Sequence, residues 1–310
     1  MNTTAEKLFD LIEKGVSPYQ VVEEAEKRLK EAGFEKLEFH TAWGLTGGKS
    51  YYMIHHGTTL IAFTIPKTLY YRESFRMAAA HTDFPCLRIK PNPEMEMSGY
   101  QQLNVEVYGG AILNTWLDRP LGIAGTVALA SDEVFAPRIV HFSSECPVAV
   151  IPNIAIHMNP ALNKGVELNK QKDMIPIVGI AGEEMQKKDF FYEYLAKELQ
   201  LSKEEILDFD LYLYNTEMPE TVGMGKELIS APRLDNLTSV QALLDGIITG
   251  EREDGINLIA LFDHEEIGSR TKQGAGSMLL RDVVEKIQIS LGRDACQVKE
   301  ALYQLSLIHI

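Results

Sequence analysis

The feature that most constrains this chain is a pair of glutamates placed just after an apolar run with the composition of a buried strand. Residues 258–262 are LIALF, and DHEE (263–266) follows without a spacer. Adjacent carboxylates beside a core are costly unless a partner balances them. Because neighbouring residues point in different directions, one glutamate can bind a metal while the other activates water, as in a metal-assisted hydrolase. An exposed acidic loop is the alternative, which the small residues at 268–269 and 274–277 disfavour.

Two further segments place polar residues at the ends of expected elements. The expected strand 75–81 ends at His81, and Asp83 lies on the same side of an extended chain, where it can fix the tautomer of a metal-binding histidine. Asp235 directly precedes an expected helix over 236–248, and a plain helix N-cap is the alternative there. Because α/β proteins place active sites at strand ends, the three segments predict a nitrogen and oxygen ligand set suited to zinc, manganese or cobalt. A two-metal site with a bridging carboxylate is one arrangement of that set.

The order of expected elements indicates two domains. Thr3 with Glu6, and Ser17 with Gln20, have capping-box spacing for two N-terminal helices. Strands are expected on both sides of residues 56–57, at 103–108, 122–130 and 138–142, and a charged helix at 182–201. Helix and strand then alternate again, with a helix at 236–248, a strand at 257–262 and a helix at 275–289. The simplest interpretation is an α/β domain interrupted by an inserted β-rich domain at about 92–221.

Charge and composition exclude several kinds of partner. Lys and Arg total 30 against 44 Asp and Glu, and the net charge of −14 disfavours a grip on nucleic-acid phosphates or anionic lipid. No apolar run approaches the roughly 20 residues that cross a bilayer, and the polar N-terminus does not match a signal peptide. The 3 cysteines are widely spaced, which favours a reducing compartment over a disulfide framework. We therefore expect a cytoplasmic protein with neither nucleic-acid nor membrane partners.

Six ordered blocks match a known family. They are HTDFPCLR (81–88), YGG (108–110), TWLDR (115–119), IAIH (154–157), PRLDN (232–236) and DHEEIGS (263–269). In these blocks the chain resembles the M18 metalloaminopeptidases, relatives of aspartyl aminopeptidase. The resemblance implies a zinc-peptidase-type α/β catalytic domain, with a mixed sheet flanked by helices, interrupted by a β-rich dimerisation domain. Its expected ranges are 1–91 and 222–304 for the catalytic domain and 92–221 for the dimerisation domain.

The resemblance also implies a site with two Zn²⁺ ions per subunit, for which Co²⁺ or Mn²⁺ are alternatives. By the family's pattern, His81 is similar to a ligand of one zinc, Glu266 to a ligand of the other, and Asp235 to the carboxylate that bridges them. Glu265 is similar to the general base that activates water for attack on a peptide bond, and Asp83 to the partner that orients His81. The implied activity is that of a zinc-dependent aminopeptidase, which releases N-terminal amino acids from peptides.

The resemblance also implies that the inserted segment, 92–221, is responsible for oligomer assembly. His157 is similar to a histidine that contacts substrate in a neighbouring subunit, and the family builds dodecamers from dimers. We therefore expect peptide substrates and a homo-oligomer. The alternative functions are a non-catalytic assembly subunit and a dizinc hydrolase of different specificity, such as a carboxypeptidase or an amidohydrolase.

The family pattern continues with an Asp ligand and a final His ligand that this chain does not contain. Residues 305–310 are LSLIHI, which match a translated sequencing adapter, so we expect an artificial tail and exclude it from the fold. The catalytic domain is then expected to be incomplete at its C-terminus. With two protein ligands per zinc instead of the usual three or more, this chain is expected to be poorly active or inactive.

Overall fold

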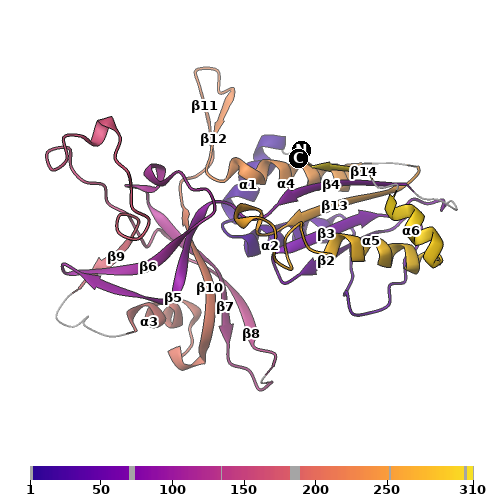
Figure 1. Cartoon of the computed structure of the whole chain (residues 1–310), viewed down its shortest axis with the longest axis horizontal. Coiled ribbons are helices and arrows are strands. Elements are labelled where there is room, and N and C mark those ends of the chain that lie inside the picture. The colour runs from indigo at the N-terminus through magenta and orange to yellow at the C-terminus, as the bar shows by residue number, and fades with distance from the viewer. Residues whose placement is uncertain are drawn as a thin grey trace. The chain divides into compact units, whose positions relative to one another are not determined.

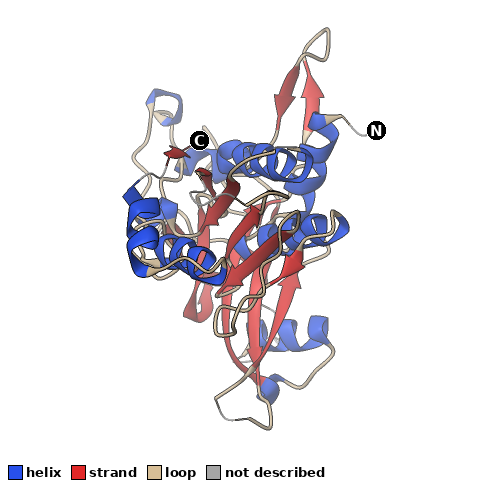
Figure 2. Cartoon of the chain, turned by 90° about the vertical axis from the view of Figure 1, so that its right-hand side faces the viewer, coloured by secondary structure: helices blue, strands red, loops and turns tan. Residues whose placement is uncertain are grey.

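The computed structural model describes residues 3–69, 74–133, 135–181, 189–250 and 253–303, and the backbone of 306–309. The chain splits into two compact units, Met1–Phe84 with Pro219–Ile310, and Pro85–Met218. Most helices and strands of both units are labelled in Figure 1, and all described elements are coloured by type in Figure 2. Among the described helices, none combines the length and apolar character that a bilayer span needs.

The first unit contains a mixed sheet. In its described part six strands are ordered β1-β2-β3-β13-β4-β14. They are β1 (Glu35–Lys36), β2 (Ser50–His55), β3 (Thr59–Thr64), β13 (Ile256–Phe262), β4 (Phe75–His81) and β14 (Ser306–His309). β13 runs antiparallel to β3 and parallel to β4, so the expected α/β unit with a mixed sheet is confirmed.

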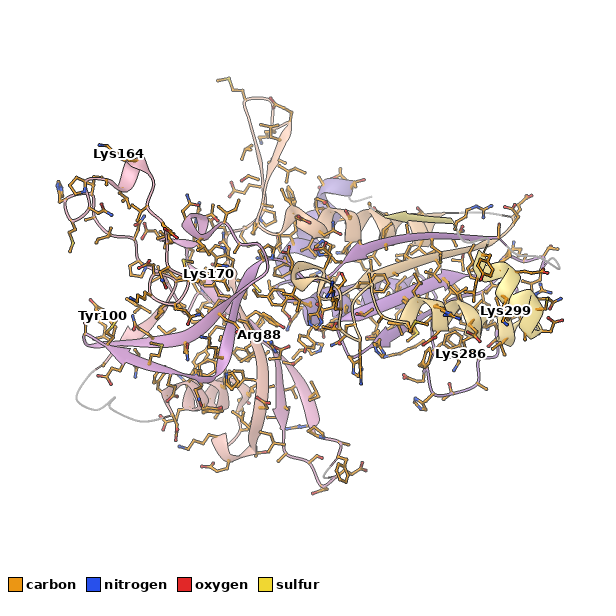
Figure 3. All side chains as sticks on the ribbon, viewed as in Figure 1. Arg88, Tyr100, Lys164, Lys170, Lys286 and Lys299 are labelled. Carbon is orange, nitrogen blue, oxygen red and sulfur yellow. The ribbon has the colours of Figure 1, made fainter. Side chains whose placement is uncertain are left out.

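Helices flank this sheet on both faces (Figure 1). They are α1 (Thr4–Lys14), α2 (Pro18–Glu31), α4 (Leu234–Thr249), α5 (Leu279–Ser290) and α6 (Ala295–Tyr303). α4 packs on β4 and β13, and α1 packs on α4. α5 buries Val283, Val284 and Ile287 against the core of the sheet. The ammonium of Lys286, a residue of α5 that Figure 3 labels, lies 4.8 Å from the ring centre of Phe39.

One of the two expected capping boxes forms. Thr3 Oγ1 accepts from the backbone N–H of Glu6, and the Glu6 carboxylate accepts from the backbone N–H of Thr3, so α1 begins as expected. α2 begins at Pro18, but Ser17 makes no side-chain cap to the helix backbone. Its buried hydroxyl donates instead to the side-chain oxygen of Gln20. The second capping box is therefore wrong, because the hydroxyl of Ser17 bonds a side chain and does not cap the helix backbone.

A short strand at the end of the described chain extends the sheet. β14 pairs in parallel with β4, with Ser306 opposite Arg76 and His309 opposite Ala79. Residues 306–309 are therefore part of this sheet, whereas the artificial origin expected for 305–310 stays a prediction. The physical reason is that β4 would otherwise present an unpaired row of N–H and C=O groups, which any extended segment can satisfy.

The second unit is built on an antiparallel sheet, as the β-rich interpretation predicts. In its described part the strands are ordered β8-β7-β10-β5-β6-β9. They are β5 (Cys86–Met97), β6 (Tyr100–Tyr108), β7 (Leu121–Leu129), β8 (Arg138–Ser143), β9 (Ile177–Ile180) and β10 (Ile206–Asn215). The domain boundary expected at residue 92 falls inside β5. Pro91 and Pro93 do not end this strand, because they lie where the β5–β6 pairing is irregular, between Ile89 and Glu94.

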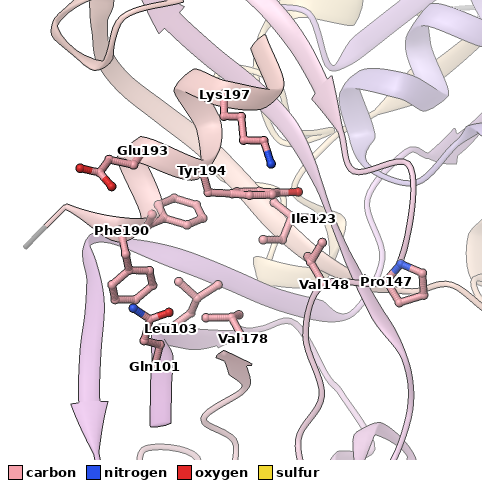
Figure 4. Close-up of a pocket in the computed structure, with 11 residues that line it drawn as sticks. Gln101, Leu103, Ile123, Pro147, Val148, Val178, Phe190, Glu193, Tyr194 and Lys197 are labelled. Atoms are coloured by element: carbon pink, nitrogen blue, oxygen red, sulfur yellow. The ribbon is translucent and has the colours of Figure 1, made fainter. Parts of the chain in front are cut away.

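Helix α3 (Phe190–Leu199) covers part of this sheet. It accounts for the C-terminal part of the helix expected over 182–201, whereas residues 182–188 lie outside the described chain. A cavity of about 670 Å³ lies between α3 and strands β6, β7 and β9 (Figure 4). Its walls are mostly apolar and include Leu103, Val178 and Phe190, with Lys197 among the polar residues.

The chain also contains a two-stranded hairpin and short 3₁₀ turns. β11 (Glu220–Val222) pairs with β12 (Leu228–Ser230) in the first unit, just before α4. The 3₁₀ turn η4 (Glu265–Ile267) follows β13. A second 3₁₀ turn, η1 (Leu113–Trp116), lies in the second unit.

Candidate metal centre

Three segments that are far apart in the sequence meet at one end of the first unit's sheet. β4 and β13 are parallel neighbours, with His81 opposite Phe262, so both strands end at the same edge. The turn η4 continues from β13, and α4 packs on both strands with its first residues at this edge. The ring atom Nε2 of His81 lies 3.4 Å from Oδ1 of Asp235 and 3.9 Å from Oε2 of Glu265. The structure therefore brings these three predicted residues together.

Asp83 holds His81 and the turn of the two glutamates in place. Its side chain is fully buried, and its two oxygens accept from the backbone N–H groups of Glu265, at 3.2 Å, and Glu266, at 3.1 Å. Its Oδ1 also lies 3.3 Å from Nδ1 of His81, and its carbonyl oxygen lies 2.9 Å from the same nitrogen. With Nδ1 donating to Asp83, the lone pair of Nε2 points toward Asp235 and Glu265. One buried carboxylate thus orients the histidine and holds the turn of the two glutamates.

The charges around His81 raise its pKa. Burial by itself would lower the pKa of the imidazole, but the hydrogen bond and charge of Asp83, helped by the charge of Glu265, reverse that effect. The three side chains differ in exposure: that of His81 is 9% exposed, Glu265 47% and Asp235 80%. The imidazole is therefore at the base of the site, and the two carboxylates face solvent.

Asp263 and His264 form a separate contact inside the same loop. Burial raises the pKa of Asp263 to about 6. Its Oδ1 accepts from the backbone N–H of His264 at 2.7 Å, and its Oδ2 lies 3.3 Å from Nε2 of that histidine. Nδ1 of His264 lies 2.7 Å from the hydroxyl of Thr271. The two ring nitrogens of His264 therefore have partners within residues 263–271, and this contact braces the loop that carries Glu265.

The glycine after the turn is required by its backbone conformation. Gly268 has a φ of +97° and closes η4 through its N–H, which donates to the carbonyl of Glu265 at 2.9 Å. Nothing lies within 4 Å of the position that a Cβ would occupy. The left-handed φ, and not a lack of space, therefore favours glycine there.

The donor atoms allow a test of whether zinc fits. Two ligands bound to one zinc at about 2.0–2.1 Å in tetrahedral geometry lie about 3.3–3.4 Å apart. The 3.4 Å between Nε2 of His81 and Oδ1 of Asp235 matches that separation. Among the described residues, no group of three or more His, Cys, Asp or Glu side chains is arranged to hold a metal ion. The separation of His81 and Asp235 is thus compatible with two ligands of one ion, and the ligand roles of His81, Asp235 and Glu266 all stay predictions.

His157 lies in the second unit, and Asn236 lies beside Asp235 in the first. His157 is exposed, in a turn of the second unit, and its contact with substrate stays a prediction. Asn236 was not singled out by the sequence, although it stands next to Asp235 in the PRLDN block. Its Oδ1 accepts from the backbone N–H of His81 at 3.1 Å. Only the fold could reveal this contact, because 155 positions separate the two residues.

Comparisons with known proteins find one family. Residues 11–308 match the family model described as "Aminopeptidase I zinc metalloprotease (M18)". A curated relative from Clostridium novyi, described as a probable M18 family aminopeptidase 2, is 42% identical over 291 residues. That alignment covers 94% of this chain and 67% of the relative, so the chain spans about two thirds of the relative's length.

Solved structures show the same fold. The chain superposes on a cryo-EM structure of the Ape4 and Nbr1 complex with a TM-score of 0.90 and 29% identity, over 95% of this chain and 60% of that one. It superposes on the mApe1 dodecamer of S. cerevisiae with a TM-score of 0.75 and 27% identity, over 92% of this chain and 66% of that one.

Proposed function

Because the chain belongs to the M18 family of zinc metalloproteases, we propose that it carries the metal site of a zinc-dependent aminopeptidase, which releases N-terminal amino acids from peptides. The observation that carries the proposal is the meeting of His81, Asp235 and Glu265 at one strand edge. The chain spans about two thirds of the C. novyi relative, so the activity proposed is that of the whole protein.

Each residue of the site has a proposed task. His81, Asp235 and Glu266 would be the residues that hold two zinc ions, with Asp235 as the carboxylate that serves both. Zinc supplies a Lewis acid that polarises the peptide carbonyl and makes water more acidic, and Co²⁺ or Mn²⁺ can take its place.

The chain's own groups move the proton. Glu265 lies beside the ligand pair and is half-exposed, so its carboxylate can reach both solvent and a bound peptide. It accepts a proton from the attacking water and passes it to the amine that leaves. Asp83 keeps Glu265 in place because its Oδ1 accepts from the backbone N–H of Glu265 at 3.2 Å. The same oxygen lies 3.3 Å from Nδ1 of His81 and orients the ring so that Nε2 faces the site.

The second unit is proposed to act in assembly. Its antiparallel sheet corresponds to the segment expected to be the dimerisation domain. A relative of known structure is a dodecamer. We propose that two copies of this unit pair, that dimers build a larger oligomer, and that His157 contacts peptide in the site of a neighbouring copy.

The base assignment is tested with Glu265→Gln. The purified chain and the variant are loaded with zinc, and aminoacyl-anilide hydrolysis and zinc content are measured on the same samples. Turnover should fall about 100-fold or more in E265Q, because the amide cannot accept the proton, while zinc content is unchanged. Glu13→Gln, a matched change on the exposed face of α1, should leave both unchanged.

Two results would contradict the proposal. Turnover by E265Q within about threefold of the parent would remove Glu265 as the base. A parent chain that contains stoichiometric zinc but hydrolyses no substrate, while the C. novyi relative does, would instead agree with the low activity expected of this chain and would leave the metal site standing. A parent chain that takes up no zinc would refute the metal site and favour a non-catalytic assembly subunit.

A further inference from the structure

The end of β4 is tied to the start of α4 by one side chain. His81 is the last residue of β4, and the ladder between β4 and β14 stops two residues earlier, at Ala79. Beyond that point the backbone N–H of His81 donates to Oδ1 of Asn236 at 3.1 Å. The amide of Asn236 thus takes the place of a neighbouring strand at the residue whose ring faces the metal site.

A second bond determines which way this amide points. Nδ2 of Asn236 donates to Oγ of Ser239 at 3.2 Å. The two ends of an asparagine amide are not equivalent, since only the oxygen accepts and only the nitrogen donates. With its nitrogen committed to Ser239, Asn236 presents its oxygen to His81. The amide is therefore held at both ends, one in the helix and one in the sheet.

The backbone of Asp235 depends on this tether. Asp235 and Asn236 have non-helical angles, with φ −85° and ψ 112° at Asp235 and φ −116° and ψ 21° at Asn236. The carboxylate of Asp235 is exposed, so packing does not hold it. Its backbone is one peptide bond away from an amide that is hydrogen-bonded to His81. This connection links the two atoms that lie 3.4 Å apart in the site, Oδ1 of Asp235 and Nε2 of His81.

We propose that Asn236 is a positioning residue of the metal site, which sets the separation of His81 and Asp235 by holding the end of β4 to the start of α4. The inference rests on the proposed function, in which His81 and Asp235 bind the same zinc. Asn236 itself binds neither metal nor substrate in this proposal. It acts through the two residues that it connects.

A purely structural role makes different predictions. If Asn236 only stabilised the first turn of α4, its loss would equal the loss of another side-chain bond in that turn. Thr238 provides that comparison, because its Oγ1 donates to the carbonyl of Leu234 at 2.8 Å, a bond that is exposed and lies within α4. Thr238→Ala is therefore the matched control for Asn236→Ala.

The test measures zinc affinity and amide exchange. Zinc dissociation constants are obtained by competition with a chromophoric chelator, and hydrogen–deuterium exchange of the His81 amide is followed in the metal-free chain. N236A should bind zinc about 10–100-fold more weakly, the usual cost of losing a residue that orients metal ligands, and should lose protection of the His81 amide. N236D keeps an oxygen at the same place and should retain both properties, and T238A should stay within twofold of the parent.

Each contrary result overturns the inference. Unchanged protection of the His81 amide in N236A would show that the bond is not made, and unchanged zinc affinity would show that it does not matter for the site. Loss of protection in N236D would show that the acceptor oxygen is not the cause. Should N236A not fold, Ser239→Ala replaces it, because it removes only the group that orients the amide. S239A must then bind zinc more weakly than T238A.

Failure of the proposed function has its own signature. A parent chain that binds no zinc refutes the aminopeptidase site, whatever the variants do. The exchange experiment uses no metal, so it still decides whether Asn236 holds His81. A parent that binds zinc, together with an N236A variant that binds it equally well, refutes the positioning role and leaves the aminopeptidase proposal standing.

Discussion

The buried carboxylate of Asp83 gives the sharpest prediction about stability. Asp83→Asn changes neither volume nor shape, but it removes the negative charge and replaces one acceptor oxygen by an NH₂ group. In the structure the two oxygens accept from the N–H groups of Glu265 and Glu266, and one of them also faces Nδ1 of His81. An asparagine can keep one of the two backbone bonds. The other backbone N–H then faces a second donor.

The expected size follows from these bonds. Hydrogen bonds to a charged group contribute about 1.5–3 kcal/mol each, and a buried donor left without a partner costs about 1–3 kcal/mol. Losing one charge-assisted bond and weakening the second should lower the free energy of unfolding of the first unit by about 3 kcal/mol. That is a large part of the roughly 5–15 kcal/mol that stabilises a typical domain.

The two tryptophans allow this unit to be observed alone. Trp43 lies in the first unit, is 5% exposed and stacks on Phe63 at 6.0 Å. Trp116 lies in the second unit. In a Trp116→Phe background, urea unfolding followed by fluorescence reports on the first unit. Asp254→Asn is the matched control, because Asp254 pairs with Arg76 on the surface and its side chain is 67% exposed.

The changes in the free energy of unfolding caused by D83N and D254N show whether the buried carboxylate of Asp83 stabilises the first unit. D254N should change the free energy of unfolding by less than about 1 kcal/mol, as exposed ion pairs do. If D83N costs no more than D254N, the carboxylate of Asp83 does not hold the turn of Glu265 and Glu266. D83N should also bind zinc more weakly than D254N, since the histidine ring loses its partner.

Three further predictions concern the framework around the site. Gly246→Ala, at an exposed position in α4 with open space around it, should stabilise the first unit by about 0.5–1 kcal/mol in the same urea assay, and a loss would contradict this. Gly125→Ala should cost about 3 kcal/mol or more in a Trp43→Phe background, because φ is +146° and a Cβ would lie 2.1 Å from the carbonyl oxygen of Asp210; a neutral result would refute the steric argument. Burial alone would raise the pKa of Glu26, but hydrogen bonds from Lys36, Lys30 and Tyr52 lower it overall. Stability from the ionised carboxylate is therefore present above its ordinary pKa of 4.5 and is lost as the pH falls, so E26Q should flatten the acid side of the stability curve, and an unchanged curve would contradict the pairing.

Local pattern predicted the elements that carry the site. The expected strand 75–81 is β4 itself, and the expected strand 257–262 differs from β13 by one residue. Both have the short apolar composition of strands buried in a sheet. The positions of His81 and of the two glutamates at the strand ends follow directly from these elements.

Local pattern failed where the chain departs from regular pairing. Prolines 91 and 93 suggested a domain boundary, yet β5 continues through them with an irregular register. β10 was not expected, although its sequence is rich in the aromatic and apolar residues that strands favour, and Leu211, Tyr212 and Leu213 are buried. Its central place between β5 and β7 depends on partners that lie more than 70 positions away.

The sequence by itself determined which residues could do chemistry: a histidine and an aspartate at the end of one strand, two glutamates at the end of another, and an aspartate before a helix. Only the tertiary structure decided that they meet. The parallel register of β4 and β13, the bonds from Asp83 to residues 182 and 183 positions away, and the bond from Asn236 to His81 are all non-local. Hydrogen bonds form between groups that are close in space, and neither strand pairing nor helix packing can be read from the residues on one strand alone.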